Sequence, residues 1–221
     1  MKVAFSLRPY QSETADKSVA FLLNQNGVGG NGLVVNPTGS GKSLVIANVV
    51  SRLDGPCVVF QPSKELLEQN FAKFRSYGFR PAIYSASVGE KRVGQITLAT
   101  IGSVQRKPEL FRHCKYAVVD ECHGVSAKNE DSMFMRFFNN LPGIRILGLT
   151  ATPYRLSTDG FGGSILKFLT RTRPRVFSEV VHVVQNGDLF REGYLAKLEY
   201  KHVKSGFNAD RLRLNSTGAD Y

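Results

Sequence analysis

The sequence predicts an α/β fold, in which helices cover both faces of a mostly parallel sheet. Short apolar, β-branched runs alternate with stretches of helical spacing, as expected for strands joined by crossover helices. The strand-like runs are hydrophobic along their whole length, which is typical of strands buried on both faces. A glycine-rich loop also joins one such run to a helix-like stretch. At 221 residues, the chain is long enough for one large domain of this class.

The first half of the chain contains alternating helix and strand signals. Apolar residues at three- and four-residue spacing follow Pro9, which suits the first turn of a helix. After a loop rich in glycine and asparagine, we expect a strand at 33–36 and a helix over about 42–53. The β-branched run at 57–60 predicts a second strand, and Ser63 predicts the cap of the next helix.

The same alternation continues along the chain. A basic turn is expected at 90–92 and a helix near 130–140. Further strands are predicted at 83–85, 95–100, 115–120 and 144–150. In such sheets, ligands bind at the carboxyl ends of the strands, which is where Asn36, Asp120 and Thr150 fall.

The C-terminal part of the chain is less regular. Between Arg155 and Arg175, basic side chains surround several glycines, which fits either a loop facing nucleic acid or a solvated charged face. Over 176–203 we expect strand-like ends around a helical stretch at 187–192. The remaining residues are polar and without periodicity. We therefore predict one domain over 1–203, followed by a polar tail over 204–221.

The composition indicates a globular protein with a polyanionic partner. A hydrophobic fraction of 42% supports a sizeable core, and 29 basic against 18 acidic residues give a net charge of +11. Nucleic acid is the usual partner of such a surface, although a basic surface also serves solubility, and a piece of a more neutral protein can carry it. Three cysteines without C-x-x-C spacing favour reduced, buried thiols and a cytoplasmic location. No run of about 18 apolar residues exists, so we expect no membrane association.

A candidate phosphate-binding loop lies between the strand at 33–36 and the next helix. Glycines allow backbone N–H groups to surround phosphate oxygens, while Lys42 supplies positive charge and Ser43 a hydroxyl for Mg²⁺. The usual pattern has glycine where this chain has Asn36. A plain Gly/Ser turn is the alternative, but the flanking strand and helix favour a nucleoside triphosphate site. The residues expected to surround the phosphates are Pro37, Thr38, Gly39, Ser40, Gly41, Lys42 and Ser43.

Two adjacent carboxylates follow the predicted strand at 115–120. If that strand neighbours the phosphate loop, Asp120 can hold Mg²⁺ through water while Glu121 polarises the water that attacks the γ-phosphate. Two acids after a strand are otherwise an ordinary start of a polar loop. The catalytic candidates are therefore Lys42, Asp120 and Glu121, and the expected cofactors are ATP and Mg²⁺, with Ser43 and Asp120 as metal ligands.

Six short motifs follow one another along the chain. They are Arg8-Pro9-Tyr10-Gln11, Pro37 to Ser43, Gln61-Pro62-Ser63-Lys64-Glu65-Leu66, Thr100-Ile101-Gly102-Ser103, Asp120-Glu121-Cys122-His123 and Gly148-Leu149-Thr150-Ala151-Thr152-Pro153. Together they resemble the first RecA-like domain of superfamily 2 helicases of the DEAD/DEAH-like type, which is a P-loop NTPase fold. The chain is most similar to the branch of the RadD repair ATPases and the motor subunits of restriction enzymes. In this family the phosphate loop commonly begins with a residue other than glycine, which accounts for Asn36.

The resemblance implies roles for individual residues. Gln11 would hydrogen-bond the adenine edge, and Arg8 could stack on its face. His123, Thr150 and Thr152 would relay the nucleotide state to the surface that binds nucleic acid. Contacts to the sugar-phosphate backbone of one strand would come from Pro62, Lys64, Gln69, Thr100 and Ser103. Ser63 and Ser103 could instead be ordinary helix caps, which is the alternative for this part of the surface.

The resemblance also implies an incomplete motor. Family members need a second RecA-like domain with arginines that reach the γ-phosphate, and such arginines contribute on the order of 10³ to 10⁵ in rate. We expect the chain, which stops at Tyr221, to be the first lobe of an ATP-dependent DNA helicase or translocase, with the tail beginning the link to the second lobe. An RNA helicase of the same superfamily is an alternative. A non-catalytic nucleic-acid-binding module is another, against which Lys42, Asp120 and Glu121 argue.

Overall fold

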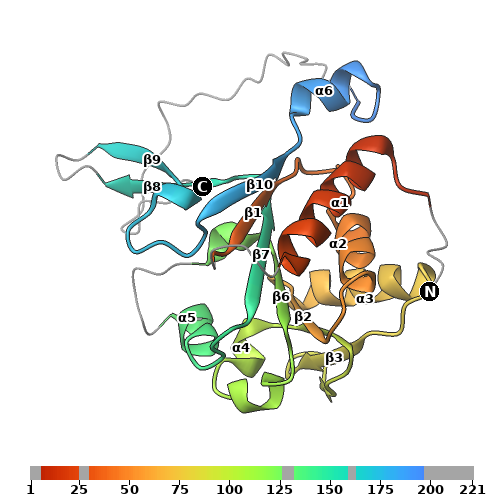
Figure 1. Cartoon of the computed structure of the whole chain (residues 1–221), viewed down its shortest axis with the longest axis vertical. Helices are drawn as coiled ribbons and strands as arrows, with labels where there is room; N and C mark the ends of the chain where they lie inside the picture. The colour runs from red at the N-terminus through yellow and green to blue at the C-terminus, as the bar shows by residue number, and fades with distance from the viewer. Residues whose placement is uncertain (1–5, 25–29, 126–131, 159–162, 197–221) are drawn as a thin grey trace, which may run out of the picture.

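The structure, a computed structural model, describes residues 6–24, 30–125, 132–158 and 163–196. Among these residues, an eight-stranded sheet runs in the order β10-β1-β7-β6-β2-β5-β3-β4 (Figure 1). Neighbouring strands pair in parallel except for β3 and β4, so the predicted fold class is confirmed. The strands are β1 (Gly32–Val35), β2 (Cys57–Phe60), β3 (Ala82–Ser85), β4 (Glu90–Lys91), β5 (Ile96–Ala99), β6 (Tyr116–Asp120), β7 (Arg145–Thr150) and β10 (Glu179–Val183).

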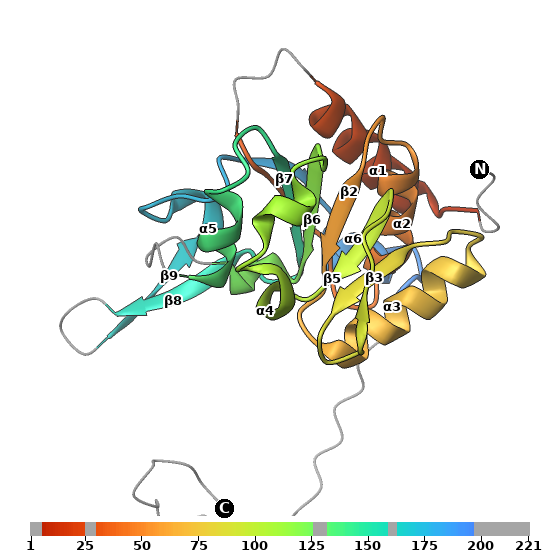
Figure 2. The same cartoon turned by 90° about the horizontal axis from the view of Figure 1, so that it is seen from below.

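Helices cover both faces of the sheet. Figures 1 and 2 show α1, α2 and α3 on one face and α4 and α5 on the other, as crossover connections between parallel strands require. The last helix, α6, follows the edge strand β10. The α-helices are α1 (Pro9–Leu23), α2 (Lys42–Ser51), α3 (Lys64–Ser76), α4 (Ile101–Val104), α5 (Met133–Phe138) and α6 (Asn186–Arg191), and the 3₁₀ helices are η1 (Pro108–Phe111), η2 (Cys122–Gly124) and η3 (Leu169–Arg171).

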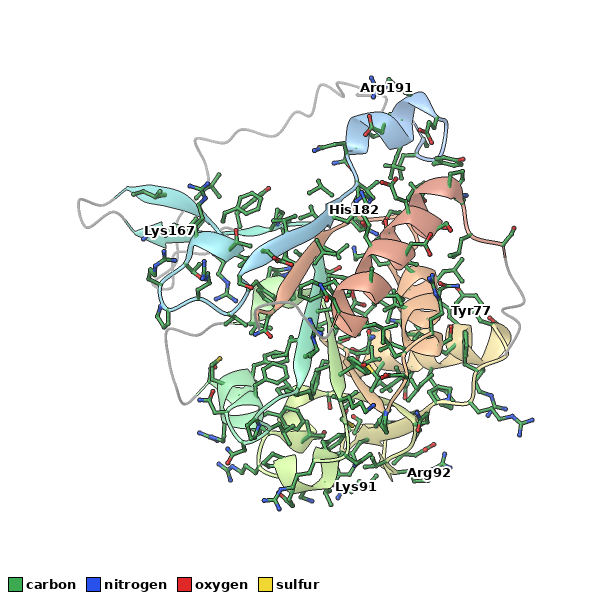
Figure 3. The ribbon with its side chains drawn as sticks, viewed as in Figure 1. Tyr77, Lys91, Arg92, Lys167, His182 and Arg191 are labelled. Carbon is green, nitrogen blue, oxygen red and sulfur yellow. The ribbon has the colours of Figure 1, made fainter. Side chains whose placement is uncertain are left out.

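Two predictions about local structure are wrong. The expected basic turn at 90–92 contains β4, because Arg92 N donates to Ile83 O at 2.8 Å and continues the antiparallel pairing with β3. The segment from Arg155 was expected to be either a loop facing nucleic acid or a solvated charged face. It contains a hairpin of β8 (Tyr154–Thr158) and β9 (Ser164–Phe168), which projects from the domain and carries Lys167 (Figure 3), so the loop prediction is wrong. The exposed basic side chains of Lys167, Arg171 and Arg175 agree with the solvated charged face. Basic residues interrupt the residue pattern that would predict a strand here. The two segments are strands because β8 and β9 pair with each other.

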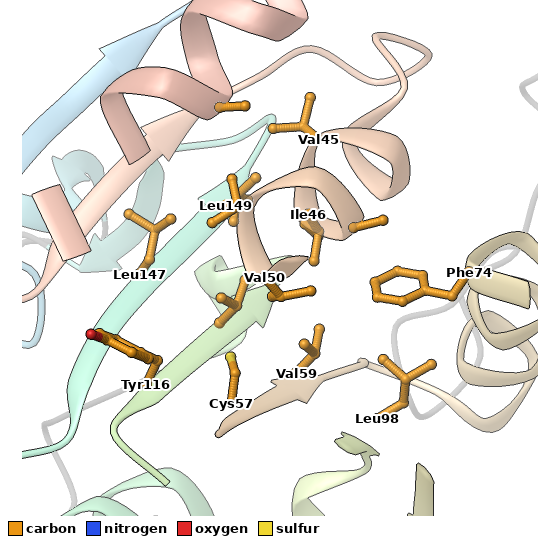
Figure 4. Packing of buried hydrophobic residues seen from close by; sticks show 14 of the residues in the cluster. Val45, Ile46, Val50, Cys57, Val59, Phe74, Leu98, Tyr116, Leu147 and Leu149 are labelled. Carbon is orange, nitrogen blue, oxygen red and sulfur yellow. The ribbon is translucent and has the colours of Figure 1, made fainter. Parts of the chain in front are cut away.

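Two hydrophobic cores form, one on each face of the sheet, because alternate side chains of a strand point to opposite faces. Cys57 and Val59 pack with α1, α2 and α3, and Figure 4 shows them beside the side chains of α2. Val58 and Phe60 point to the other face, where Phe60 meets the α5 rings of residues 134, 137 and 138 with centroids 5.2 to 5.9 Å away. Burial of a side chain of this size stabilises the fold by about 1.5–3 kcal/mol relative to leaving it exposed. The two cores therefore keep in place the sheet edge that carries the polar residues.

Some expectations are settled only in part by the described residues. All three cysteines are buried and free of disulfides, as predicted. None of the described helices combines the length and apolar composition that crossing a bilayer requires. The expected strand after α6 and the tail over 204–221 lie outside the described residues, as does the first part of the helix predicted near 130–140. The proposed division at residue 203 stays a prediction.

Candidate nucleotide site

The phosphate loop joins β1 to α2 at the carboxyl edge of the sheet. Asn36 N donates to Thr150 O of the adjacent strand β7 at 2.9 Å, which holds the loop to the sheet. Gly39 and Gly41 have φ values of +80° and +82°, a left-handed conformation that glycine adopts without steric cost. Gly41 immediately precedes the ten-residue helix α2, so free N–H groups of its first turn lie at the loop. This geometry fits an anionic phosphate chain.

The motif Arg8-Pro9-Tyr10-Gln11 at the start of α1 contacts the backbone of the phosphate loop. Tyr10 Oη and Gln11 Nε2 both donate to Ser40 O, each at 2.8 Å. The other end of the Gln11 amide accepts from Arg8 N at 3.0 Å. The Gln11 amide therefore uses one N–H and one oxygen lone pair within the protein, and its second N–H and second lone pair remain for an adenine edge. The predicted base contact stays a prediction.

The neighbour of Arg8 is an aromatic side chain that sequence reasoning missed. The Arg8 guanidinium lies over the ring of Tyr194, 4.7 Å from its centroid, and the rings of Tyr10 and Tyr194 are 5.2 Å apart. Tyr194 follows α6, so the end of the described chain packs against the start of α1. No sequence motif marks this tyrosine, and only the return of the chain across the sheet brings it here.

The catalytic candidates meet opposite the loop, at the end of β6. Lys42 Nζ lies 3.2 Å from Glu121 Oε1, and Asp120 Oδ1 accepts from Glu121 N at 3.0 Å. Glu121 has φ of +49°, and among the described residues it is the non-glycine residue with positive φ, a conformation that costs about 1–2 kcal/mol. Burial, followed by the charge of Glu121, raises the pKa of Asp120 to about 6, while Lys42 lowers it.

The predicted metal ligands suit Mg²⁺. Ser43 Oγ donates its proton to Asn70 Oδ1 at 2.6 Å, so its lone pairs stay available to a cation. Asp120 is buried near the cationic Lys42, and its carboxylate oxygens are hard ligands of the kind that Mg²⁺ prefers. The donor set therefore fits the cofactor that the sequence predicts.

The three predicted coupling residues lie together. His123 Nδ1 is 3.0 Å from Thr150 Oγ1 and 3.2 Å from Thr152 Oγ1. The same nitrogen is 3.4 Å from Glu121 Oε2. Thr152 N donates to Thr150 Oγ1 at 3.0 Å. A continuous polar contact thus runs from the carboxylate beside Lys42 to the segment that follows β7.

The residues predicted to touch nucleic acid follow β2 and β5. Pro62 precedes α3 and Lys64 and Gln69 lie on it, while Thr100 follows β5 and Ser103 lies on α4. Pro62, Lys64 and Gln69 are exposed. Thr100 and Ser103 are occupied with other protein groups, because their hydroxyls are 2.9 Å apart and Ala86 N donates to Ser103 Oγ at 2.8 Å.

The alternative role as helix caps is confirmed at one of the two serines. Ser63 caps α3, accepting from Leu66 N at 3.3 Å. Ser103 is not a cap, since α4 begins at Ile101 with Thr100 before it, and its hydroxyl instead ties α4 to the residue after β3. Nucleic-acid contacts at these positions stay predictions.

Comparisons with known proteins agree with this geometry. A family model described as "Type III restriction enzyme, res subunit" matches residues 4–155. The chain is 28% identical over 229 residues to a putative DNA 3'-5' helicase Rad25 of Haloarcula marismortui, covering 98% of this chain and 32% of the relative. It is 30% identical over 157 residues to the DNA 3'-5' translocase XPB2 of Sulfurisphaera tokodaii, covering 70% and 33%. The chain thus spans about a third of the length of these relatives.

Solved structures share the fold. The helicase domain of Pyrococcus furiosus Hef matches with a TM-score of 0.63 at 18% identity, covering 91% of this chain and 43% of that one. The UvsW helicase of bacteriophage T4 matches with a TM-score of 0.60 at 17% identity, covering 82% and 64%. At such identities the likeness shows the fold alone, and it confirms the RecA-like architecture that the motifs predict.

Proposed function

The chain belongs to the type III restriction enzyme res subunit family, and on that basis we propose that it is the ATP-binding lobe of an ATP-dependent DNA helicase or translocase. The observation that carries the proposal is the contact of Lys42 with Glu121 beside a phosphate loop of two left-handed glycines. A non-catalytic binding module would not need a cation paired with a carboxylate held in an unfavourable backbone conformation.

The proposed reaction uses this chain's groups for positioning and charge. The N–H groups of the phosphate loop hold the β- and γ-phosphates. Lys42 breaks its contact with Glu121 and neutralises the charge that develops on these phosphates. Glu121 is then free to orient the attacking water. Ser43 and Asp120 would hold Mg²⁺, which supplies further charge neutralisation at the phosphate oxygens. His123 contacts the same carboxylate, so release of Glu121 changes the surroundings of Thr150 and Thr152.

A second RecA-like domain is the proposed partner across the cleft. An apolar groove of about 890 Å³ lies beside the loop residues Pro37 and Thr38 and extends between Tyr154 and α6. Phe168 and Phe190 line it and are exposed in the described structure. An exposed apolar groove at this place suits a domain that closes on the nucleotide. We infer DNA rather than RNA because these relatives are named DNA helicase and DNA translocase. The name of the family favours a role in restriction, and DNA repair is the other role that we propose.

The decisive test is nucleotide binding by the 221-residue chain. Calorimetric titration with ATP and Mg²⁺ should give saturable binding, which Lys42→Ala weakens at least about tenfold, as loss of a charge-assisted contact predicts. Lys91→Ala, an equal loss of charge on β4, should bind as the parent does. In a longer form with a second RecA-like domain, DNA should stimulate ATP hydrolysis. Equal ATP hydrolysis by Lys42→Ala and its parent in that form would refute the proposal.

A further inference from the structure

A buried chain of side-chain hydrogen bonds leads away from Ser43. Its hydroxyl donates to Asn70 Oδ1 on α3 at 2.6 Å, and Asn70 Nδ2 donates to Gln61 Oε1 at 2.6 Å. Asn70 and Gln61 are each only 3% exposed. Gln61 is anchored in turn, because its backbone N donates to Ala99 O at 2.9 Å. The chain therefore joins the predicted metal ligand on α2 to the end of the sheet strand β2.

A serine hydroxyl has one proton and two lone pairs. When the proton points to Asn70, both lone pairs of Ser43 Oγ are free, and a cation can approach them without competing with that proton. A hydroxyl without such an acceptor rotates freely, and the proton must be turned away from the cation on binding. Acceptance by Asn70 thus prepares Ser43 for a cation before one arrives.

The amide of Asn70 has two ends that differ chemically, and only the oxygen can accept. Gln61 Oε1 accepts from the Asn70 nitrogen, so turning the Asn70 amide over would bring two oxygens together and leave the hydroxyl without its acceptor. Burial of both amides makes such a mismatch costly. With the Gln61 amide as it lies, Asn70 accepts the Ser43 proton. Gln61 Nε2 has no hydrogen-bond partner among the described residues, so no second bond fixes the Gln61 amide itself.

We propose that Asn70 is a positioning residue that directs the Ser43 lone pairs at Mg²⁺, and that Gln61 supports it by accepting from the Asn70 amide nitrogen. The inference rests on the proposed Mg²⁺-dependent ATP binding but names residues that no sequence motif assigned to the metal. Residues that orient a metal ligand typically contribute about 10- to 100-fold to metal affinity.

The test compares ATP affinity in Mg²⁺ with ATP affinity in EDTA, measured by calorimetry on the 221-residue chain. Asn70→Leu keeps the size of the side chain and removes the acceptor. We expect it to reduce the Mg²⁺-dependent gain in affinity by about 10- to 100-fold, with ATP affinity in EDTA close to that of the parent. Gln61→Leu should cause a smaller loss in the same direction.

Two further variants separate positioning from folding. Asn70→Asp keeps an acceptor for the Ser43 proton, since the Gln61 amide can turn and donate to the new carboxylate, and should keep the Mg²⁺-dependent gain. Asn48→Leu makes the same change on the half-buried side of α2, the helix that carries Ser43, and should behave as the parent does.

The outcomes are distinct. An unaltered Mg²⁺-dependent gain in a folded Asn70→Leu chain would overturn the inference while leaving the proposed function intact. An equal loss in Asn70→Leu and Asn70→Asp would overturn it too, because acceptance of the proton would then not matter. Absence of ATP binding by the parent chain would instead refute the proposed function and the inference with it.

Discussion

The two halves of the carboxyl edge of the sheet differ in whether their polar side chains have hydrogen-bond partners within the protein. At the ends of β1, β6 and β7, the side-chain amide of Asn36 and the hydroxyl of Ser40 are buried without a hydrogen-bond partner among the described residues. At the ends of β3 and β5, the hydroxyls of Ser85, Thr100 and Ser103 bond to one another and to the backbone. The first half thus leaves these buried groups unpaired, whereas the hydroxyls of the second half are paired within the protein. The buried Gln61 Nε2 after β2 is the exception there, because it has no partner among the described residues.

The difference shows where a ligand has the most to contribute. Buried polar groups without partners and a carboxyl group with a raised pKa destabilise the ligand-free protein, so they are expected where a ligand offsets them. Glu121, in a left-handed conformation, belongs to the same half. Polar groups that are already hydrogen-bonded within the protein do not indicate a ligand site. The nucleotide site therefore has support in the geometry that Thr100 and Ser103 of the predicted nucleic-acid surface lack.

The largest expected effect comes from adding one methyl group to the phosphate loop. A Cβ on Gly41 would lie 2.5 Å from Gln11 Nε2, and φ of +82° disfavours any side chain. Gly41→Ala should destabilise the native loop by about 1–3 kcal/mol. If the loop moves to relieve this strain, ATP binding should be roughly 5- to 150-fold weaker. Calorimetry with Mg-ATP measures this loss.

The matched change in the other half is Gly102→Ala on α4. A Cβ there would meet nothing within 4 Å, and alanine is a better helix former than glycine by up to about 1 kcal/mol. Gly102→Ala should leave ATP affinity unchanged and slightly raise the free energy of unfolding. Equal losses of ATP binding in both variants would show that the two halves do not differ as described.

An intermediate effect is expected from the charge of Asp120. Its pKa of about 6 lies above the ordinary value of 3.8, so ionisation destabilises the folded chain. The stability that protonated Asp120 provides is full below about pH 4 and is lost as the pH rises through about 6. At about 1.4 kcal/mol per tenfold change in proton affinity, the loss is at most about 3 kcal/mol.

Asp120→Asn should therefore be more stable than the parent at pH 7.5 without ligand, by about 1–3 kcal/mol, and the difference should vanish near pH 4. Urea unfolding at the two pH values measures it. Asp54→Asn is the control of opposite sign, because the hydrogen bond from Tyr116 Oη lowers the pKa of Asp54 and its ionised form stabilises the fold. A parent chain more stable than Asp120→Asn at pH 7.5 would contradict the assignment.

The smallest effect is expected at the second half of the edge. Lys64 is exposed, and its Nζ lies 3.9 Å from Glu68 Oε1, a surface pair that contributes a few tenths of a kcal/mol. Lys64→Ala should change the free energy of unfolding by less than about 0.5 kcal/mol. If Lys64 meets a phosphate, the slope of log affinity for DNA against log salt should fall by about 0.9. Lys73→Ala, on the same helix, should leave the slope unchanged.

Much of the fold follows from the sequence because its local signals agree with one another. The strand at 57–60 was predicted with the observed bounds, since its β-branched residues are buried on both faces. The hairpin β8–β9 was not predicted, because Leu156 and Leu166 are exposed and no buried face gives the segment a strand pattern. Pairing between the two segments, which no single window contains, is what makes them strands.

The candidate site divides in the same way. Residue types and spacing were enough to predict the phosphate loop and the carboxylates at 120 and 121, because their chemistry resides in short motifs next to strand ends. The contacts of Asn70 and Tyr194 could not be predicted, since neither residue belongs to a motif that reveals its neighbour. Their contacts depend on how α3 and the end of the chain pack against the sheet.

The sequence by itself determined the order of the buried parallel strands and the helices between them, the polar residues at the strand ends and the family. The tertiary structure decided which of those polar residues are satisfied by the protein and which are left for a ligand. Hydrogen bonds of buried groups join residues far apart in the chain, as between Ser43 and Asn70, and such partners exist only once the helices lie on the sheet.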